Sequence, residues 1–198
     1  MSLIKRLGCS RVCVVAALPH EFRSADCYTG IGKLNAAINL SGYIKTHRPS
    51  LVINVGSCGS RNNELKNKVV RVSQFVEWDK ELIKGFEAPM VLEENNTLNL
   101  PYQKVVCGTG DRFFNEDVYY HEFFLQDRRS ADIDCDIFDM HIFDMEAYAL
   151  AKTCQVNDIQ FLSLKYVSDS GCIDQWEESL PKIHLIFEEV LINILESV

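Results

Sequence analysis

Two carboxylates stand where chemistry on a small ligand is possible. Glu146 lies in the segment FDMEA of residues 143–147 and opens a run with helical spacing. Asp169 follows an apolar, strand-like run at residues 161–167. A carboxylate at the carboxyl end of a buried strand in an α/β protein lies where such folds bind ligands. We therefore expect a pocket with one acid for chemistry and one for holding a polyol.

Strands and helices that alternate along the chain must position these two acids. Apolar runs predict strands, and three- and four-residue spacing predicts helices. The expected strands are residues 11–17, 51–55, 69–76, 105–107 and 159–167, and the expected helices are residues 32–47, 146–154 and a C-terminal amphipathic helix with Pro181 in its first turn. Arg48 should end the helix at residues 32–47, because it precedes Pro49. Residues 80–100 are polar and irregular, which is typical of a loop or a sheet edge.

This order predicts an α/β fold of three layers, in which helices flank a mixed, mostly parallel central sheet. We expect residues 1–198 to form a single domain, because no glycine- or proline-rich linker divides the chain. The sequence is 47% hydrophobic and 24% charged, which suits a packed core.

The composition also excludes several classes of function. The formal net charge of −8, without a basic patch, disfavours nucleic-acid binding. We expect a cytoplasmic protein without membrane contact, since no apolar run is long enough to span a bilayer. The eight cysteines form no CxxC pair and the five histidines no HExxH group, so we expect free thiols and no metal site.

Several weaker motifs have ordinary structural explanations when each is taken alone. The segment TGIGK at residues 29–33 lacks the spacing of a P-loop, so a tight turn into a helix explains it equally well. The segment GSCG at residues 56–59 could grip a polar ligand with its amides, or could simply turn a strand into a loop. Glu21 alone would be an acid near a helix start.

Taken in order, these motifs resemble the purine nucleoside phosphorylase and nucleosidase superfamily, and within it most closely the 5′-methylthioadenosine/S-adenosylhomocysteine nucleosidases. The resemblance runs from about residue 11 to the C-terminal helix. The motifs that carry it are ALPHE at 17–21, TGIGKLNAA at 29–37, INVGSCG at 53–59, GDRFFN at 110–115, MEA at 145–147 and VSD at 167–169.

The resemblance implies a division of labour in the hydrolysis of an N-glycosidic bond, without a cofactor. Asp169 would protonate purine N7, with Ser168 orienting it, and Glu21 would activate the attacking water. Glu146 would accept hydrogen bonds from the ribose hydroxyls, with Met145 packing on the sugar. The negative carboxylates would stabilise the positive charge that develops on the sugar.

The remaining roles implied by the resemblance concern the base and the 5′-substituent. Phe113 would stack on the base, and the backbone of Phe114 would read its edge. The residues expected beside the sugar and the 5′-substituent are Ser57, Gly59, Leu18, Ile31 and Trp176. The apolar members favour a thioether tail on an adenine nucleoside such as 5′-methylthioadenosine or S-adenosylhomocysteine. Such a nucleosidase is expected to be a homodimer.

Three alternatives stay open. A phosphorylase would need a fixed guanidinium for phosphate, and none precedes Gly56. The arginines that could replace it are Arg23, Arg48, Arg61 and Arg112. Futalosine-type nucleoside cleavage is a related possibility. The third alternative is a degenerate nucleoside-binding protein without turnover, because the segment from Glu21 to Gly30 is shorter than in the nucleosidases and implies a shortened N-terminal sheet edge.

Overall fold

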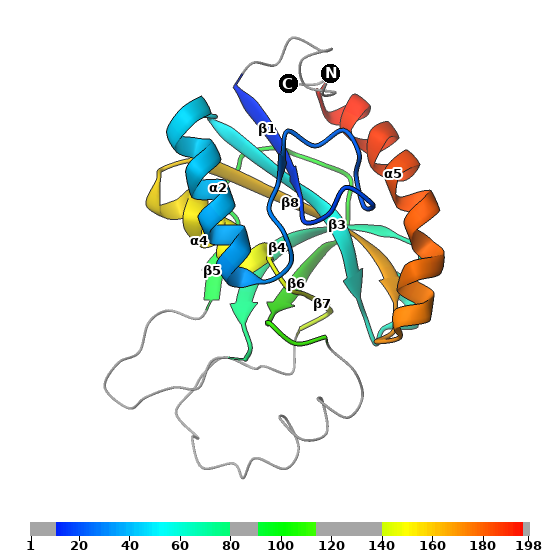
Figure 1. Cartoon of the computed structure of the whole chain (residues 1–198). Coiled ribbons are helices and arrows are strands. Elements are labelled where there is room, and N and C mark those ends of the chain that lie inside the picture. The colour runs from blue at the N-terminus through cyan, green and yellow to red at the C-terminus, as the bar shows by residue number, and fades with distance from the viewer. Residues whose placement is uncertain (1–10, 80–90, 114–139, 196–198) are drawn as a thin grey trace, which may run out of the picture.

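The computed structural model describes residues 11–79, 91–113 and 140–195, which form a sheet with helices on both faces (Figure 1). The strands are β1 (Val12–Ala16), β2 (Cys27–Tyr28), β3 (Leu51–Gly59), β4 (Val69–Glu77), β5 (Val91–Glu93), β6 (Lys104–Thr109), β7 (Ile142–Asp144) and β8 (Gln160–Asp169). The helices are α2 (Lys33–His47), η1 (Asn63–Leu65), α4 (Ala147–Val156) and α5 (Ile173–Leu195). No helix among these residues is long and apolar enough to cross a membrane.

The sheet is mixed, with more parallel than antiparallel pairings among the described strands, as the sequence predicts. Strands β2, β1, β3 and β8 are parallel neighbours in that order. Strand β8 also pairs with β4 in an antiparallel direction, and β4 pairs with β6 in a parallel direction. The three-residue strand β7 pairs with both β6 and β3, so β3, β8, β4, β6 and β7 close into a ring. The sequence did not predict this closure.

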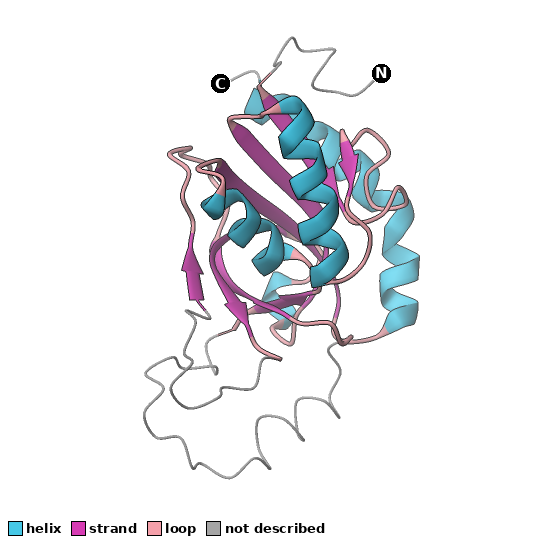
Figure 2. Cartoon of the chain, turned by 60° about the vertical axis from the view of Figure 1, so that its left-hand side comes forward, coloured by secondary structure: helices cyan, strands magenta, loops and turns pink. Residues whose placement is uncertain are grey.

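Alternate side chains of the central strands enter two separate cores, because successive residues of a strand point to opposite faces. Cys13 and Val15 of β1 join the core beneath α2 and α4. Val14 and Ala16 join the core beneath α5. Figures 1 and 2 show the resulting layers, with α2 and α4 on one side of the sheet and α5 on the other. The continuous apolar runs of the sequence follow from this two-sided burial.

Most of the expected elements are present within one to three residues. Helix α2 ends at His47, and Arg48 takes a left-handed conformation with φ of 48°, which confirms the predicted stop before Pro49. Strand β5 lies at the sheet edge inside the segment expected to be loop or edge structure. The N-terminal edge is short, since β2 has only two residues beside β1.

The predicted start of the C-terminal helix was wrong. Helix α5 begins at Ile173, so Pro181 lies inside it rather than in its first turn. A proline at this position removes one backbone hydrogen bond of the helix. Leu180 packs against the core cluster that contains Ile183, Phe187 and Leu191, so the packing of α5 extends to the N-terminal side of the proline.

Candidate active site

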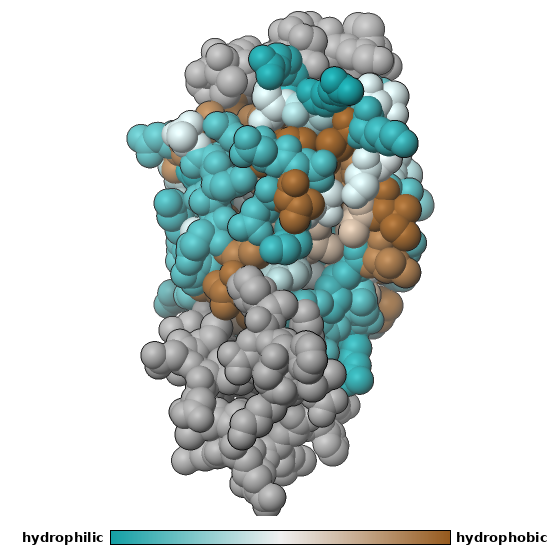
Figure 3. Space-filling view, turned by 90° about the vertical axis from the view of Figure 1, so that its left-hand side faces the viewer, coloured by the Kyte–Doolittle hydropathy of each residue, from teal (hydrophilic) through white to brown (hydrophobic). Residues whose placement is uncertain are grey.

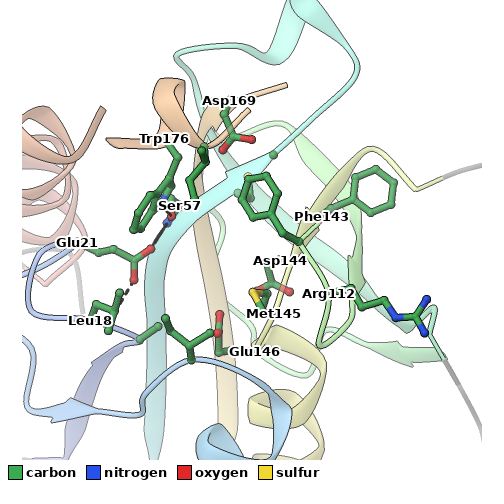
Figure 4. Close-up of a pocket in the computed structure, with 16 residues that line it drawn as sticks. Leu18, Glu21, Ser57, Arg112, Phe143, Asp144, Met145, Glu146, Asp169 and Trp176 are labelled. Carbon is green, nitrogen blue, oxygen red and sulfur yellow. Dashed lines mark hydrogen bonds between the residues drawn. The ribbon is translucent and has the colours of Figure 1, made fainter. Parts of the chain in front are cut away.

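A cavity lies at the carboxyl ends of the parallel strands β1, β3 and β8, where α/β folds bind ligands. Glu21, Glu146 and Asp169 border it from three different parts of the chain (Figure 4). Apolar and aromatic side chains supply most of the remaining wall. The lining residues are Ala17, Leu18, Glu21, Ile31, Ser57, Cys58, Gly59, Arg112, Phe113, Phe143, Asp144, Met145, Glu146, Asp169, Ile173 and Trp176.

The structure brings together nearly all the residues that the sequence singled out. Those that line the cavity are Glu21, Asp169, Ser57, Gly59, Ile31, Phe113, Met145, Glu146 and Leu18. Ser168 does not line it but is buried behind Asp169. Phe114 lies outside the described residues. Among the described residues no group of histidine, cysteine and acidic side chains is arranged to hold a metal ion.

Glu21 is buried in spite of the short segment that follows it, and three donors hold its carboxylate. The backbone N–H and the hydroxyl of Ser57 both donate to Oε1, at 2.9 and 2.5 Å. The backbone N–H of Leu18 donates to Oε2 at 3.3 Å. The shortened sheet edge therefore leaves Glu21 fixed against β3, inside the cavity.

The segment Gly56 to Gly59 serves a different purpose from the one expected. It is not a loop with free amides, because β3 continues to Gly59 and the Ser57 amide already binds Glu21. A Cβ on Gly56 would lie 3.3 Å from Glu21 Oε1, and a Cβ on Gly59 would lie 3.0 Å from Asp169 Oδ1. The two glycines thus leave room for two carboxylates beside the strand.

Asp169 ends β8 and is held by its own neighbours. Its Oδ1 accepts the backbone N–H of Gly171 at 2.9 Å, and its Oδ2 lies 2.7 Å from the Ser168 hydroxyl. The same hydroxyl lies 3.2 Å from the carbonyl oxygen of Cys58. These contacts fix the plane of the carboxyl group. Asp169 as a whole residue is 3% exposed.

Glu146 precedes α4 and reaches across to the start of α2. Its Oε1 accepts the backbone N–H of Gly32 at 2.8 Å. Burial, reinforced by the nearby charge of Asp144, raises the pKa of Glu146 to about 8 from its usual 4.5, although Lys165 and the Gly32 N–H oppose the shift. A pKa of about 8 favours the protonated form of Glu146 at neutral pH.

We expect Glu146 to make the unliganded protein less stable as the pH rises from about 5 to about 8. In this window the folded state keeps a proton that the unfolded state has lost, so the free energy of unfolding falls by up to about 1.4 kcal/mol per pH unit. Urea unfolding of wild type and Glu146→Gln at several pH values measures this slope. The variant should lack the Glu146 contribution, and parallel curves would contradict the assignment.

A buried ion pair lies beside Glu146, and the sequence analysis did not predict this pair. Lys165 Nζ is 2.7 Å from Asp144 Oδ2, and both side chains are almost fully buried. Asp144 also accepts the Thr109 hydroxyl and the backbone N–H of Ala147, which fixes the start of α4. Burial alone would lower the pKa of Lys165, but Asp144 and then Glu146 raise it above its usual value. Lysine within a buried apolar strand is the signal that could have revealed such a pair.

The turn before α2 is occupied by carboxylates rather than left open for phosphate. Gly32 donates its N–H to Glu146, and Lys33 donates its own N–H to Asp111 at 2.7 Å. The Lys33 ammonium contacts Glu77 at 2.9 Å and also Asp79. The explanation as a tight turn into a helix is therefore correct.

The family of the chain follows from comparison with known proteins. The sequence model described as "Phosphorylase superfamily" matches residues 68–197, more than half of the chain. The chain belongs to the phosphorylase superfamily. This membership agrees with the resemblance carried by the motifs that line the cavity.

Curated relatives of this phosphorylase-superfamily chain are 5′-methylthioadenosine/S-adenosylhomocysteine nucleosidases. The protein from Exiguobacterium sp. is 30% identical over 163 residues, covering 72% of this chain and 66% of the relative. The protein from Bacillus cytotoxicus is 27% identical over 165 residues, covering 71% of this chain and 65% of the relative. The chain thus spans about two thirds of the length of these relatives.

Solved structures share the fold at low sequence identity. A Helicobacter pylori nucleosidase variant with 5′-methylthioadenosine in its active site superposes with a TM-score of 0.77 at 16% identity, covering 96% of this chain and 99% of that one. The Neisseria meningitidis nucleosidase in complex with methylthio-immucillin-A gives a TM-score of 0.75 at 20% identity, covering 96% and 100%. The mixed sheet with helices on both faces is therefore the fold of these enzymes.

Proposed function

We propose that this chain hydrolyses the N-glycosidic bond of an adenine nucleoside with a 5′-thioether, such as 5′-methylthioadenosine or S-adenosylhomocysteine. The observation that carries the proposal is the convergence of Glu21, Glu146 and Asp169 on one largely apolar cavity. Buried acids in different environments can take opposite roles in one reaction. The names of the curated relatives support the same reaction and substrate class.

In the proposed reaction, Asp169 gives its proton to N7 of the base as the bond between C1′ and N9 breaks. Glu21 takes a proton from water while the water oxygen bonds to C1′. The products are the free base and the 5′-substituted ribose, and the proton gained by Glu21 balances the one lost by Asp169. Ser168 and Gly171 support the role of Asp169, because they hold its carboxyl group in one orientation.

Glu146 would bind the ribose hydroxyls in its ionised form. A sugar with developing positive charge, together with two donating hydroxyls, favours a carboxylate over a carboxylic acid. Met145 and Ile31 line the same cavity and would cover the apolar parts of the nucleoside. Leu18, Ile173 and Trp176 would surround the thioether, since they add apolar surface to this wall.

Water is a better candidate for the nucleophile than phosphate is. Of the described arginines, Arg112 alone lines the cavity, and in Figure 4 its guanidinium points away from the four labelled acids. Arg48 lies at the opposite end of the sheet, in a second hollow with Arg11 and Lys45. Lys165 is already paired with Asp144. Among the described residues, a phosphate dianion would therefore lack the fixed guanidinium that usually binds it.

Release of free adenine from 5′-methylthioadenosine, measured with and without phosphate, tests the proposed function. We expect release in phosphate-free buffer, with free 5-methylthioribose as the second product. Release that depends on phosphate and yields a sugar phosphate would instead support the phosphorylase. Tight nucleoside binding without any adenine release would support the degenerate protein.

We also propose that the chain forms a homodimer through the exposed face of α2. Leu34 and Ile38 lie one helical turn apart and are 71% and 60% exposed, and Ile31 beside them is 48% exposed. Figure 3 shows this side of the molecule, which is mostly hydrophilic with separate hydrophobic groups. We expect Ile38→Lys to shift the mass measured by light scattering from dimer to monomer. A wild-type monomer at micromolar concentration would overturn the proposal.

A further inference from the structure

The indole of Trp176 makes a polar contact inside the cavity as well as an apolar one. Its Nε1 lies 2.9 Å from the Ser57 hydroxyl oxygen, and that oxygen lies 2.5 Å from Glu21 Oε1. Figure 4 shows the three side chains in this order, with Trp176 reaching down from α5 onto the strand that carries Ser57. The three residues come from α5, β3 and the segment after β1, so only the fold brings them together.

The chemistry of the three groups allows one arrangement of protons. An indole N–H can only donate a hydrogen bond, so the Ser57 oxygen must accept from Trp176. The single hydroxyl proton of Ser57 is then free to point at Glu21. The Ser57 backbone N–H donates to the same Oε1, and the Leu18 N–H donates to Oε2. Glu21 therefore accepts on both oxygens, as an ionised carboxylate does.

The backbone around Trp176 fixes the position of the indole. Trp176 lies in the first turn of α5, where its backbone N–H donates to the Cys172 carbonyl at 3.2 Å. The Ser179 hydroxyl donates to the Trp176 carbonyl at 2.6 Å. Gly56 contributes from the other side, because a Cβ there would crowd Glu21 Oε1. The contact thus depends on α5 beginning at Ile173, well before Pro181.

We propose that Trp176 is a positioning residue, whose indole N–H sets the direction of the Ser57 hydroxyl and so keeps Glu21 ready to take a proton from the attacking water. The inference rests on the proposed hydrolysis for its catalytic consequence. The hydrogen-bond relay from Trp176 through Ser57 to Glu21 is a property of the protein without substrate. Loss of the indole N–H would free the Ser57 hydroxyl to rotate, and Glu21 would lose its shortest hydrogen bond.

A double-mutant cycle on adenine release tests this role. Trp176→Phe removes the N–H but keeps an aromatic ring, and we expect it to lower kcat about tenfold, the effect of one hydrogen bond. The KM should change less than kcat, because phenylalanine keeps an apolar ring in the wall proposed to surround the thioether. The same substitution in a Ser57→Ala background should have almost no further effect, because the residue through which Trp176 acts is gone. Equal effects in both backgrounds would show that Trp176 acts only by packing, and would overturn the proposal.

A measurement without substrate separates failure of the relay from failure of the proposed function. The chain has two tryptophans, so Trp176→Phe assigns the indole N–H signal of Trp176 in an NMR spectrum. We expect Ser57→Ala and Glu21→Gln each to shift that signal, whereas Gly42→Ala on the open side of α2 should not. An unshifted signal in Ser57→Ala would refute the relay even in an active enzyme. Shifted signals in a protein that releases no adenine would refute the hydrolysis and leave the relay intact.

Discussion

Replacing Asp169 by asparagine is expected to slow adenine release by about 10²–10⁴-fold, the usual range for loss of a general acid. Asparagine fills the same space beside Gly59 and can still contact Ser168 and Gly171. It cannot supply an acidic proton to N7. Steady-state rates of adenine release from 5′-methylthioadenosine measure the loss, and the melting temperature checks that the variant is folded.

A leaving group that needs no proton provides the control for Asp169. 4-Nitrophenyl riboside releases a stable phenolate, so its hydrolysis by Asp169→Asn should fall far less than adenine release. Glu21→Gln should impair both substrates, because each requires an activated water. If Asp169→Asn slowed the two substrates equally, the acid would serve to place the sugar rather than to protonate the base.

The sequence predicted those parts of the fold whose burial leaves a regular pattern. Strands β1, β3 and β8 are covered on both faces and read as apolar runs, and α2 shows helical spacing with a stop before Pro49. Two site residues were found from their places at the end of a buried strand and at the start of a helix, and the others from the resemblance of the motifs. Asp169 and Glu146 occupy those two places.

The parts that the sequence did not predict depend on contacts between distant segments. Strand β7 has three residues, too few for a period to be read, yet it closes the ring between β6 and β3. The first two turns of α5 are largely polar, so Pro181 was the stronger local signal for a helix start. The hydrogen bond from Trp176 to Ser57 depends on that early start and spans 119 positions of sequence.

Lys165 carries the last large effect, because its ammonium is a positive charge buried inside a strand. Lys165→Met keeps the apolar stem but leaves the Asp144 carboxylate without its ion-pair partner. Breaking one side of a buried pair costs about 3–5 kcal/mol, and we expect the lower part of that range because Thr109 and Ala147 still donate to Asp144. Urea unfolding measures the change.

Two variants control for side-chain removal at Lys165. Lys104→Met removes a lysine whose side chain is 63% exposed and 3.7 Å from Glu94, so it should change the free energy of unfolding by less than about 1 kcal/mol. Combining Lys165→Met with Asp144→Asn removes both buried charges and should recover part of the lost stability. A Lys165→Met protein that unfolds at the same urea concentration as Lys104→Met would refute a stabilising pair.

The same substitution also has an expected effect on substrate binding, through Glu146. Lys165 opposes the rise in the pKa of Glu146, so its removal should raise that pKa further. A larger share of Glu146 is then protonated at neutral pH and unable to accept both ribose hydroxyls. We expect the KM of a folded Lys165→Met protein to rise at neutral pH and to recover as the pH increases. A KM that stays equal to wild type at every pH would mean that the pair stabilises the fold without tuning the ribose site.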